Sequence, residues 1–214
     1  MGKEIARKLS WKNQVIILAK NKEKLNEVAE ELKCAGMQCD VSNFLAVREV
    51  VGQVAKRFNK IDALINNAGL WLGGEIDDND PVEIKRLYEV NILGVTLLSR
   101  EVAMMMKQQG QGEIINIISQ DGLYGKAGRA VYSASKCAVT GLTKSLQEEL
   151  APYGIKVSGV YPGLMNTNLF EKRGETRDMT YAMKPEVVAG LVEYLVTLPA
   201  EINVPEVGIK HIKN

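Results

Sequence analysis

The sequence of 214 residues has little cysteine, one histidine, no excess of charge and no long apolar run. Its three cysteines, Cys34, Cys39 and Cys137, show no metal-ligand spacing, so we expect no metal site and free, buried thiols in a reducing compartment. The net charge of +1 offers no basic surface to nucleic acid or to an anionic membrane. No apolar run approaches the ~18 residues of a membrane span, and the first residues do not resemble a signal peptide. These absences predict a cytoplasmic protein without nucleic-acid or membrane partners.

The pattern of apolar residues alternates between strand and helix along the whole chain. Strands are expected at residues 14–18 (buried), 34–39, 63–65, 113–118, 155–161 and 206–212. Helices are expected at residues 22–32, from an N-cap at Ser42 to 58, and at 81–107, 132–153 and 185–198. Such alternation favours parallel pairing, and no repeat or linker interrupts it. Residues 1–214 are therefore predicted to form a single α/β domain around a doubly wound parallel sheet.

In sheets of this kind, ligands bind at the carboxyl ends of the strands. Ser119 directly follows the strand predicted at 113–118, and Tyr132 and Lys136 lie at i and i+4 on one face of the next helix. An ammonium beside a phenol is expected to lower the tyrosine pKa from about 10, and the Ser119 hydroxyl could bind a substrate oxygen that gains negative charge. By itself, a Tyr-x-x-x-Lys pair would more simply be a solvated helix face.

Further polar motifs follow the other predicted strands or lie in the helices between them. In chain order, the complete set is Asn66-Asn67-Ala68-Gly69, Asn91, Ser119, Tyr132-x-x-x-Lys136 and Pro162-Gly163-x-x-x-Thr167. In order and spacing, this set resembles the motifs of the short-chain dehydrogenase/reductases, and the resemblance extends over residues 2–212. It implies a Rossmann-type fold and a nicotinamide-dependent oxidoreductase.

The resemblance also implies a role for each catalytic position. Tyr132 is expected to be the general acid/base, Lys136 its pKa partner and a ribose ligand, and Ser119 the hydroxyl that polarises the carbonyl. Asn91 is expected to hold a water molecule of the proton relay. The substrate lid of the family is expected at residues 168–183, where Arg173, Gly174, Glu175 and Thr176 suit an exposed, flexible loop.

A dinucleotide site is implied by the same resemblance. Its expected residues are Asp40 and Val41 at the adenine, Asn67, Ala68 and Gly69 in a turn beside the cofactor, Tyr132 and Lys136 at the ribose, and Pro162, Gly163 and Thr167 at the nicotinamide. NAD-binding proteins usually place an acid at the end of the second strand. Here Lys20 and Asn21 stand at that position, and a cation suits the 2′-phosphate of NADP, so NADP is preferred over NAD. A surface lysine in a turn is the alternative.

The N-terminus departs from the family pattern, which begins with a strand and a Gly-x-x-x-Gly-x-Gly loop that binds the pyrophosphate at a helix N-terminus. Gly2 resembles the last glycine of that loop, followed by a helix with Ile5, Ala6 and Leu9 inside; Met1 could be the middle residue of a Gly-Met-Gly version. The first strand has no counterpart. Its absence is expected to leave backbone groups without partners on the strands at 14–18 and 63–65. We expect a shortened gene model, an engineered truncation or unrecorded residues, with a naturally shortened protein as the alternative.

The sequence thus predicts an oxidoreductase that transfers a hydride between NADP(H) and a small carbonyl or alcohol substrate, similar to the beta-ketoacyl-carrier-protein reductases, and that forms a homodimer or homotetramer. The alternative is a non-catalytic member that acts as a binding or oligomer partner. The intact Ser119, Asn91, Tyr132 and Lys136 favour the enzyme, whereas the missing loop favours the alternative.

Overall fold

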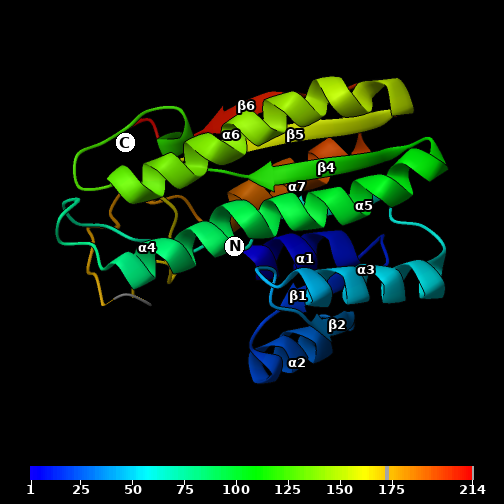
Figure 1. The fold of residues 1–214 in the computed structure, drawn as a ribbon, viewed down its shortest axis with the longest axis horizontal. Helices are drawn as coiled ribbons and strands as arrows, with labels where there is room; N and C mark the ends of the chain where they lie inside the picture. Colours follow the sequence, from blue (N-terminus) through cyan, green and yellow to red (C-terminus); the bar gives the residue numbers. More distant parts are fainter. Residues whose placement is uncertain (172–173, 214) are drawn as a thin grey trace.

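The computed structural model in Figure 1 describes residues 1–171 and 174–213 and alternates helices with strands. The strands are β1 (Ile16–Ala19), β2 (Ala35–Gln38), β3 (Ala63–Asn66), β4 (Gly112–Ile117), β5 (Ile155–Pro162) and β6 (Glu206–Ile209). The helices are α1 (Gly2–Ser10), α2 (Lys22–Glu31), α3 (Phe44–Phe58), α4 (Pro81–Tyr88), α5 (Val95–Gln109), α6 (Ala130–Leu150) and α7 (Pro185–Thr197). This order confirms the predicted α/β architecture.

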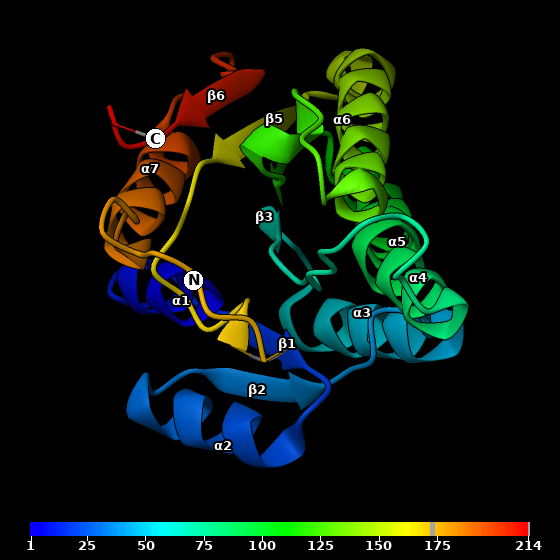
Figure 2. The same ribbon diagram turned by 90° about the vertical axis from the view of Figure 1, so that its left-hand side faces the viewer.

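Every strand pair in the described residues is parallel, but the strands form two separate sheets. One sheet has four strands in the order β3-β4-β5-β6, and the other consists of β1 and β2. In Figure 2, β1 and β2 lie apart from β3, on the side of the molecule that carries α2. The gap predicted between the strand at 14–18 (β1) and the strand at 63–65 (β3) is therefore confirmed.

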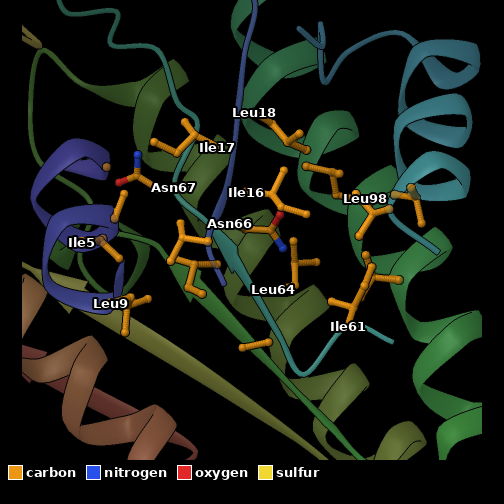
Figure 3. A pocket seen from close by; sticks show the side chains of 18 of the residues that line it. Ile5, Leu9, Ile16, Ile17, Leu18, Ile61, Leu64, Asn66, Asn67 and Leu98 are labelled. Atoms are coloured by element: carbon orange, nitrogen blue, oxygen red, sulfur yellow. The ribbon is translucent and has the colours of Figure 1, made fainter. Parts of the chain in front are cut away.

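A cavity of about 490 Å³ lies between β1 and β3. Ile16 and Leu18 line it from β1, Leu64 from β3, Ile5 from α1 and Leu98 from α5, as Figure 3 shows. All four residues of β1 are only half-buried, so the expectation of a fully buried strand is wrong. The physical reason is that β1 has a hydrogen-bonded neighbour on one edge only.

Helices cover both faces of the four-stranded sheet. Adjacent residues of β4 point to opposite faces, as the period of a strand requires: Ile114 packs in one core and Ile115 in the other. The first core contains Val47 of α3 and Val102 of α5, and the second contains Val188 of α7. Full burial of an aliphatic side chain contributes about 1.5–3 kcal/mol to the free energy of unfolding. The two cores therefore stabilise the sheet whose strands end at the polar residues of the site.

Two predicted helix features are corrected by the structure. The N-cap of α3 is Asn43, whose side chain accepts a hydrogen bond from the Ala46 amide, while the Ser42 hydroxyl donates to Asp40 Oδ1 at 2.6 Å. The helix expected at 81–107 is interrupted by a π-helical segment, Glu89–Gly94, between α4 and α5.

Two further expectations fail at the surface. Strand β6 ends at Ile209 rather than at residue 212, which leaves His211 outside the sheet. Of the three thiols that were expected to be free and buried, all are free but only Cys39 is buried; Cys34 is half-buried and Cys137 is exposed. Among the described helices, none has the length and apolarity needed to cross a bilayer.

Candidate active site

The structure brings Ser119, Tyr132 and Lys136 together at the carboxyl end of β4. Tyr132 and Lys136 lie on the buried face of α6, and each is only 6% exposed. The Lys136 Nζ is 5.7 Å from the centre of the Tyr132 ring. The Ser119 side chain caps the turn after β4 and hydrogen-bonds Tyr132. The three side chains that the sequence singled out therefore form one compact group.

Burial dominates the electrostatics of this group. It raises the pKa of Tyr132 well above its usual value of 10, although the hydrogen bond from Ser119 and the charges of Arg129 and Arg177 act in the opposite direction. Burial also lowers the pKa of Lys136 to about 8. The expectation of a lowered tyrosine pKa is thus wrong for this structure, because loss of water penalises the phenolate more than its neighbours stabilise it. Tyr132 holds its proton at neutral pH.

Asn91 lies in the π-helical segment between α4 and α5 and is fully buried. Its Oδ1 accepts a hydrogen bond from the Leu70 amide at 2.7 Å, and its Nδ2 donates to the Leu70 carbonyl at 3.0 Å and to Ser135 Oγ at 3.1 Å. Ser135 in turn donates to the Tyr132 carbonyl at 2.7 Å. Asn91 therefore links the turn after β3 to the first turns of α6. π-Helical segments often occur at functional sites, and here the segment carries this link.

The turn after β3 faces both the group of Ser119, Tyr132 and Lys136 and the cavity. A Cβ added at Gly69 would lie 3.6 Å from Asn91 Oδ1 and 3.7 Å from Lys136 Nζ, so the glycine leaves space beside the ammonium. Asn67 and Ala68 line the cavity between β1 and β3. The Oδ1 atoms of Asn66 and Asn67 are buried without a hydrogen-bond partner among the described residues. Unsatisfied buried oxygens next to a cavity fit a site that accepts hydrogen bonds from a ligand.

After the carboxyl ends of β1 and β2, Lys20 and Asp40 form an ion pair of 2.6 Å between Nζ and Oδ2. The Lys20 side chain is 74% exposed, so its ammonium is accessible from solvent. Asn21 accepts a hydrogen bond from the Lys24 amide and so caps α2. Val41 packs against Gly94, where an added Cβ would meet Val41 Cγ2 at 2.8 Å. The predicted adenine-side and 2′-phosphate residues are therefore neighbours.

Helix α1 begins at the cavity. Gly2 is its first residue, and its N-cap, Met1, makes no side-chain capping hydrogen bond. A Cβ added at Gly2 would approach Asn67 Nδ2 to 2.6 Å, so the helix N-terminus lies close to the Asn67 side chain in the turn after β3. The N-terminus of a helix favours anions.

The expected nicotinamide-side residues follow β5. Pro162 is the last residue of that strand, and the Gly163 amide donates to the Ile209 carbonyl of β6 at 2.8 Å. The Thr167 amide donates to the Met165 carbonyl at 2.9 Å. These residues begin the segment that packs against Tyr132.

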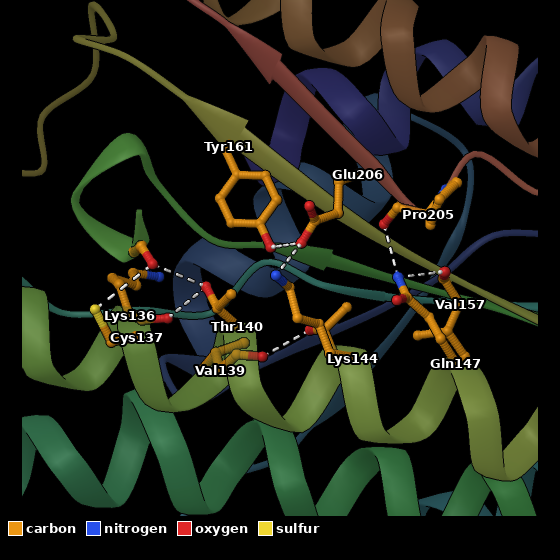
Figure 4. Close-up of polar contacts among 12 residues, drawn as sticks. Lys136, Cys137, Val139, Thr140, Lys144, Gln147, Val157, Tyr161, Pro205 and Glu206 are labelled. Carbon is orange, nitrogen blue, oxygen red and sulfur yellow. Dashed lines mark hydrogen bonds and ion pairs between the residues drawn. The ribbon is translucent and has the colours of Figure 1, made fainter. Parts of the chain in front are cut away.

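Contacts with β5 and β6 fix the position of α6, as Figure 4 shows. The Glu206 carboxylate of β6 accepts a hydrogen bond from the Tyr161 hydroxyl at 3.2 Å and forms an ion pair with Lys144 at 3.2 Å. Gln147 donates to the carbonyls of Val157 and Pro205. The helix that carries Tyr132 and Lys136 is therefore held against two strands by polar contacts along its length.

Trp71 and the lid region form a cluster over Tyr132 that the sequence did not predict. The Trp71 ring lies 4.6 Å from the Tyr132 ring, and its Nε1 donates to both carboxylate oxygens of Glu175 at 2.7 and 2.8 Å. Glu175 was expected in an exposed loop; this expectation is wrong because the carboxylate binds a buried indole. Arg173, also named for that loop, lies outside the described residues.

Two arginines complete this cluster. Arg129 ion-pairs with the buried Asp121 at 3.1 Å, and Arg177 lies over the Trp71 ring. The sequence could have indicated that Arg129 lies near Tyr132, because Arg129 is the N-cap of α6 and stands three residues before Tyr132. No local pattern identified Arg177, because its contact with Trp71 joins residues that are distant in the chain.

Comparisons with a protein family, with related sequences and with solved structures agree with the parallel α/β fold and the polar groups at its strand ends. The family described as short chain dehydrogenase matches residues 1–178. An uncharacterized oxidoreductase of Staphylococcus epidermidis is 30% identical over 215 residues, which cover 99% of this chain and 93% of the relative. The solved structure of serine dehydrogenase from Escherichia coli is 29% identical, with a TM-score of 0.88, and the match covers 100% of this chain and 94% of the other.

A further solved structure, a variant of actinorhodin polyketide ketoreductase with NADPH, is 29% identical with a TM-score of 0.90, and the match covers 98% of this chain and 91% of the other. The fold and site define an α/β oxidoreductase. The chain belongs to the short-chain dehydrogenase/reductase family.

Proposed function

We propose that this protein is an NADP(H)-dependent carbonyl reductase or alcohol dehydrogenase in which Tyr132 is the general acid/base. The observation that carries the proposal is the compact group of Ser119, Tyr132 and Lys136 at the carboxyl end of β4, where Lys136 Nζ lies 5.7 Å from the Tyr132 ring. Ligands of open parallel sheets bind at this edge. The NADPH bound to the ketoreductase relative supports the choice of cofactor.

The chain's own residues fit a dinucleotide at both ends. Asp40 and Lys20 would hold the adenosine half with its 2′-phosphate, and Lys136 with Asn67 would hold the nicotinamide ribose. The unpartnered Oδ1 of Asn67 and the position of the N-terminus of α1 beside it support this assignment. When bound, the reduced nicotinamide would supply a hydride to the substrate carbonyl carbon.

The protein residues then handle the oxygen of the carbonyl. Ser119 donates a hydrogen bond that stabilises the growing negative charge on this oxygen. Tyr132 transfers its hydroxyl proton to the oxygen, which yields the alcohol and leaves a phenolate. Lys136 stabilises that phenolate as an ammonium. The raised pKa of Tyr132 keeps the phenol protonated before reaction, as a proton donor for carbonyl reduction requires.

The experiment compares Tyr132→Phe with Tyr124→Phe, a change of the same size at a side chain that is 65% exposed. Each is prepared as the 214-residue chain and as a strand-extended form, in which an apolar strand of five residues and a glycine-rich loop precede Met1. NADPH consumption is measured with a panel of small carbonyl compounds. We expect turnover in the strand-extended form, its loss in Tyr132→Phe by at least ~1,000-fold, and no change in Tyr124→Phe.

Nucleotide binding is measured in the same variants. Tyr132→Phe removes only the transferable proton, so it should bind NADPH almost as well as the parent, whereas Lys136→Ala should lose both binding and turnover. The absence of turnover from every form, with NADPH binding retained, would instead support a non-catalytic binding role. The cavity between β1 and β3 is the observation that keeps this second function open.

A further inference from the structure

Arg177 occupies an unusual position in the segment that covers Tyr132. Its guanidinium carbon lies 4.6 Å from the centre of the Trp71 ring and 4.3 Å from that of the Phe170 ring. The two rings meet edge to face, with centroids 5.0 Å apart. Cation–π contacts act within about 6 Å, so both aromatic faces hold the guanidinium in place.

The segment that carries Arg177 is fixed at its base and at its centre. Met165 and Met183 form a parallel bridge, and the Met183 amide donates to the Leu164 carbonyl at 2.9 Å. Glu175 accepts two hydrogen bonds from the Trp71 indole. The Arg177 guanidinium carbon lies 4.6 Å from the centre of the Trp71 ring, and the centre of the Tyr132 ring also lies 4.6 Å from it. Trp71 therefore joins Arg177 and Tyr132 in one cluster of side chains.

The charges of this cluster are not balanced at Arg177. Arg129 has Asp121 as its ion-pair partner at 3.1 Å, and the Glu175 carboxylate is bound by the Trp71 indole. Within the described part of the chain, Arg177 makes no ion pair of its own. Burial, and after it the charge of Arg129, lower the pKa of Arg177, and the nearby charges of Glu175 and Asp121 offset this only in part. A half-buried guanidinium without a carboxylate partner is costly, and a planar carboxylate is the anion that its paired N–H groups bind best.

We propose that Arg177 binds the carboxylate of the substrate, and that the protein acts on short oxo acids or the corresponding hydroxy acids, with the carbonyl carbon one or two carbons from the carboxylate. This inference rests on the proposed function for the reaction itself. Arg177 is the specificity residue: it orients the acid so that the substrate carbonyl meets Tyr132 and Ser119. Trp71 and Phe170 fix the guanidinium, and the Trp71–Glu175 contact fixes the loop.

Substrate binding can be measured without any nicotinamide, because Trp71 is an intrinsic probe. The chain has two tryptophans, and Trp11 is 85% exposed. In a Trp11→Phe background of the full 214-residue chain, all tryptophan fluorescence therefore comes from Trp71. The probes are acetoacetate and acetoacetamide, which match in size and differ in charge. We expect acetoacetate to change the fluorescence with a dissociation constant at least tenfold lower than that of acetoacetamide.

Three variants complete the design. Arg177→Gln should raise the dissociation constant of acetoacetate at least tenfold and leave that of acetoacetamide unchanged. Arg177→Lys keeps the charge but loses the paired geometry, so it should show an intermediate loss and also guards against a folding defect. Arg48→Gln, at an exposed position on α3, is the matched control and should bind like the parent.

Equal affinity for the two probes, no binding of acetoacetate, or an unchanged affinity in Arg177→Gln would overturn the inference. The proposed function fails separately: if acetoacetate binds through Arg177 but no carbonyl compound is reduced with NADPH, the site is an oxo-acid site without the proposed reaction. Conversely, the parent and Arg177→Gln could reduce neutral carbonyl compounds at equal rates. That result would support the proposed reaction and contradict the proposed preference for oxo acids.

Discussion

Asn91 holds the backbone of Leu70 at both of its polar atoms, through hydrogen bonds of 2.7 Å from the Leu70 amide and 3.0 Å to its carbonyl. The same side chain also binds Ser135 on α6. The turn beside Lys136 and the helix that carries Tyr132 are thus fixed relative to each other by one buried amide.

Replacement of Asn91 by leucine should destabilise the fold, because the amide and carbonyl of Leu70 would lose their partner in a buried place. Each unsatisfied group costs about 1–3 kcal/mol, so we expect a decrease of about 3 kcal/mol in the free energy of unfolding, measured by urea denaturation. Asn26→Leu, on the exposed face of α2, is the control and should change stability by less than ~0.5 kcal/mol. Similar values for the two variants would show that the contacts of Asn91 do not support the site.

The cofactor preference should depend on Lys20. The proposed 2′-phosphate contact is electrostatic, so Lys20→Asp should weaken NADPH binding at least tenfold and make NADH the tighter ligand. The comparison is an equilibrium titration of both nucleotides in the strand-extended form. Lys56→Asp, an equal charge change on the exposed side of α3, should leave the order unchanged. An unaltered preference in Lys20→Asp would show that Lys20 does not meet the 2′-phosphate.

Stability should rise between about pH 8 and pH 10 because of Lys136. Its pKa is about 8 in the folded protein and 10.5 in a free chain, so the unfolded state binds more protons in this range, and stability grows as the pH rises. The expected gain is about 2 kcal/mol in the free energy of unfolding, and it should vanish in Lys136→Met. Above pH 10 the sign reverses, because Tyr132, with its raised pKa, keeps in the folded state a proton that the unfolded state releases.

The measurement for this prediction is urea unfolding at half-unit steps from pH 7 to pH 11. Lys144→Met, at a lysine that is 57% exposed, is the matched control and should retain the rise. A parent curve that parallels the Lys136→Met curve over this range would contradict the lowered pKa of Lys136.

The cavity between β1 and β3 should accept a strand. Both flanking strands are parallel to their other neighbours, and the cavity lining is largely apolar, so an added apolar strand would gain ladder hydrogen bonds and buried surface. We expect the strand-extended form to melt at least ~5 °C higher than the 214-residue chain. A control extension of equal length with serine and asparagine in place of the apolar residues should give no increase.

The same pair of proteins tests how the cofactor is positioned. Turnover needs the nicotinamide within about 3–3.5 Å of the carbonyl carbon, and a pyrophosphate bound only by the N-terminus of α1 has fewer amide donors. We expect NADPH to raise the melting temperature of the strand-extended form but not of the 214-residue chain, which should show no measurable turnover. A clear melting shift and turnover from the shorter chain would show that the cavity does not limit the enzyme.

Local patterns predicted the parts of the site that depend on spacing. Tyr132 and Lys136 share a helix face because they are four residues apart, and the order of strands and helices followed from apolar periodicity. The position of the gap followed from the order of strands in parallel sheets. These features depend on local geometry or on general rules of topology, which a sequence carries directly.

The failed expectations depend on tertiary contacts. The pKa of Tyr132 is set by burial under Trp71 and the lid, which no local pattern shows. Glu175 looked like a solvated loop residue because its partner, Trp71, is 104 positions away in the chain. At the start of α3, Ser42 and Asn43 are both good caps, and the hydrogen bond of Ser42 to Asp40 decides between them.

The central claim, that a nicotinamide hydride and a Tyr132 proton reduce a carbonyl at this site, is tested most directly by isotope transfer. NADPH carrying deuterium at both C4 positions of the nicotinamide is incubated with the strand-extended protein and acetoacetate, and the alcohol product is analysed by mass spectrometry and NMR. We predict one deuterium on the former carbonyl carbon, a hydroxyl proton from solvent exchange, and no product from Tyr132→Phe. An unlabelled alcohol, equal labelled product from Tyr132→Phe, or no product from the parent with any carbonyl compound would contradict the account.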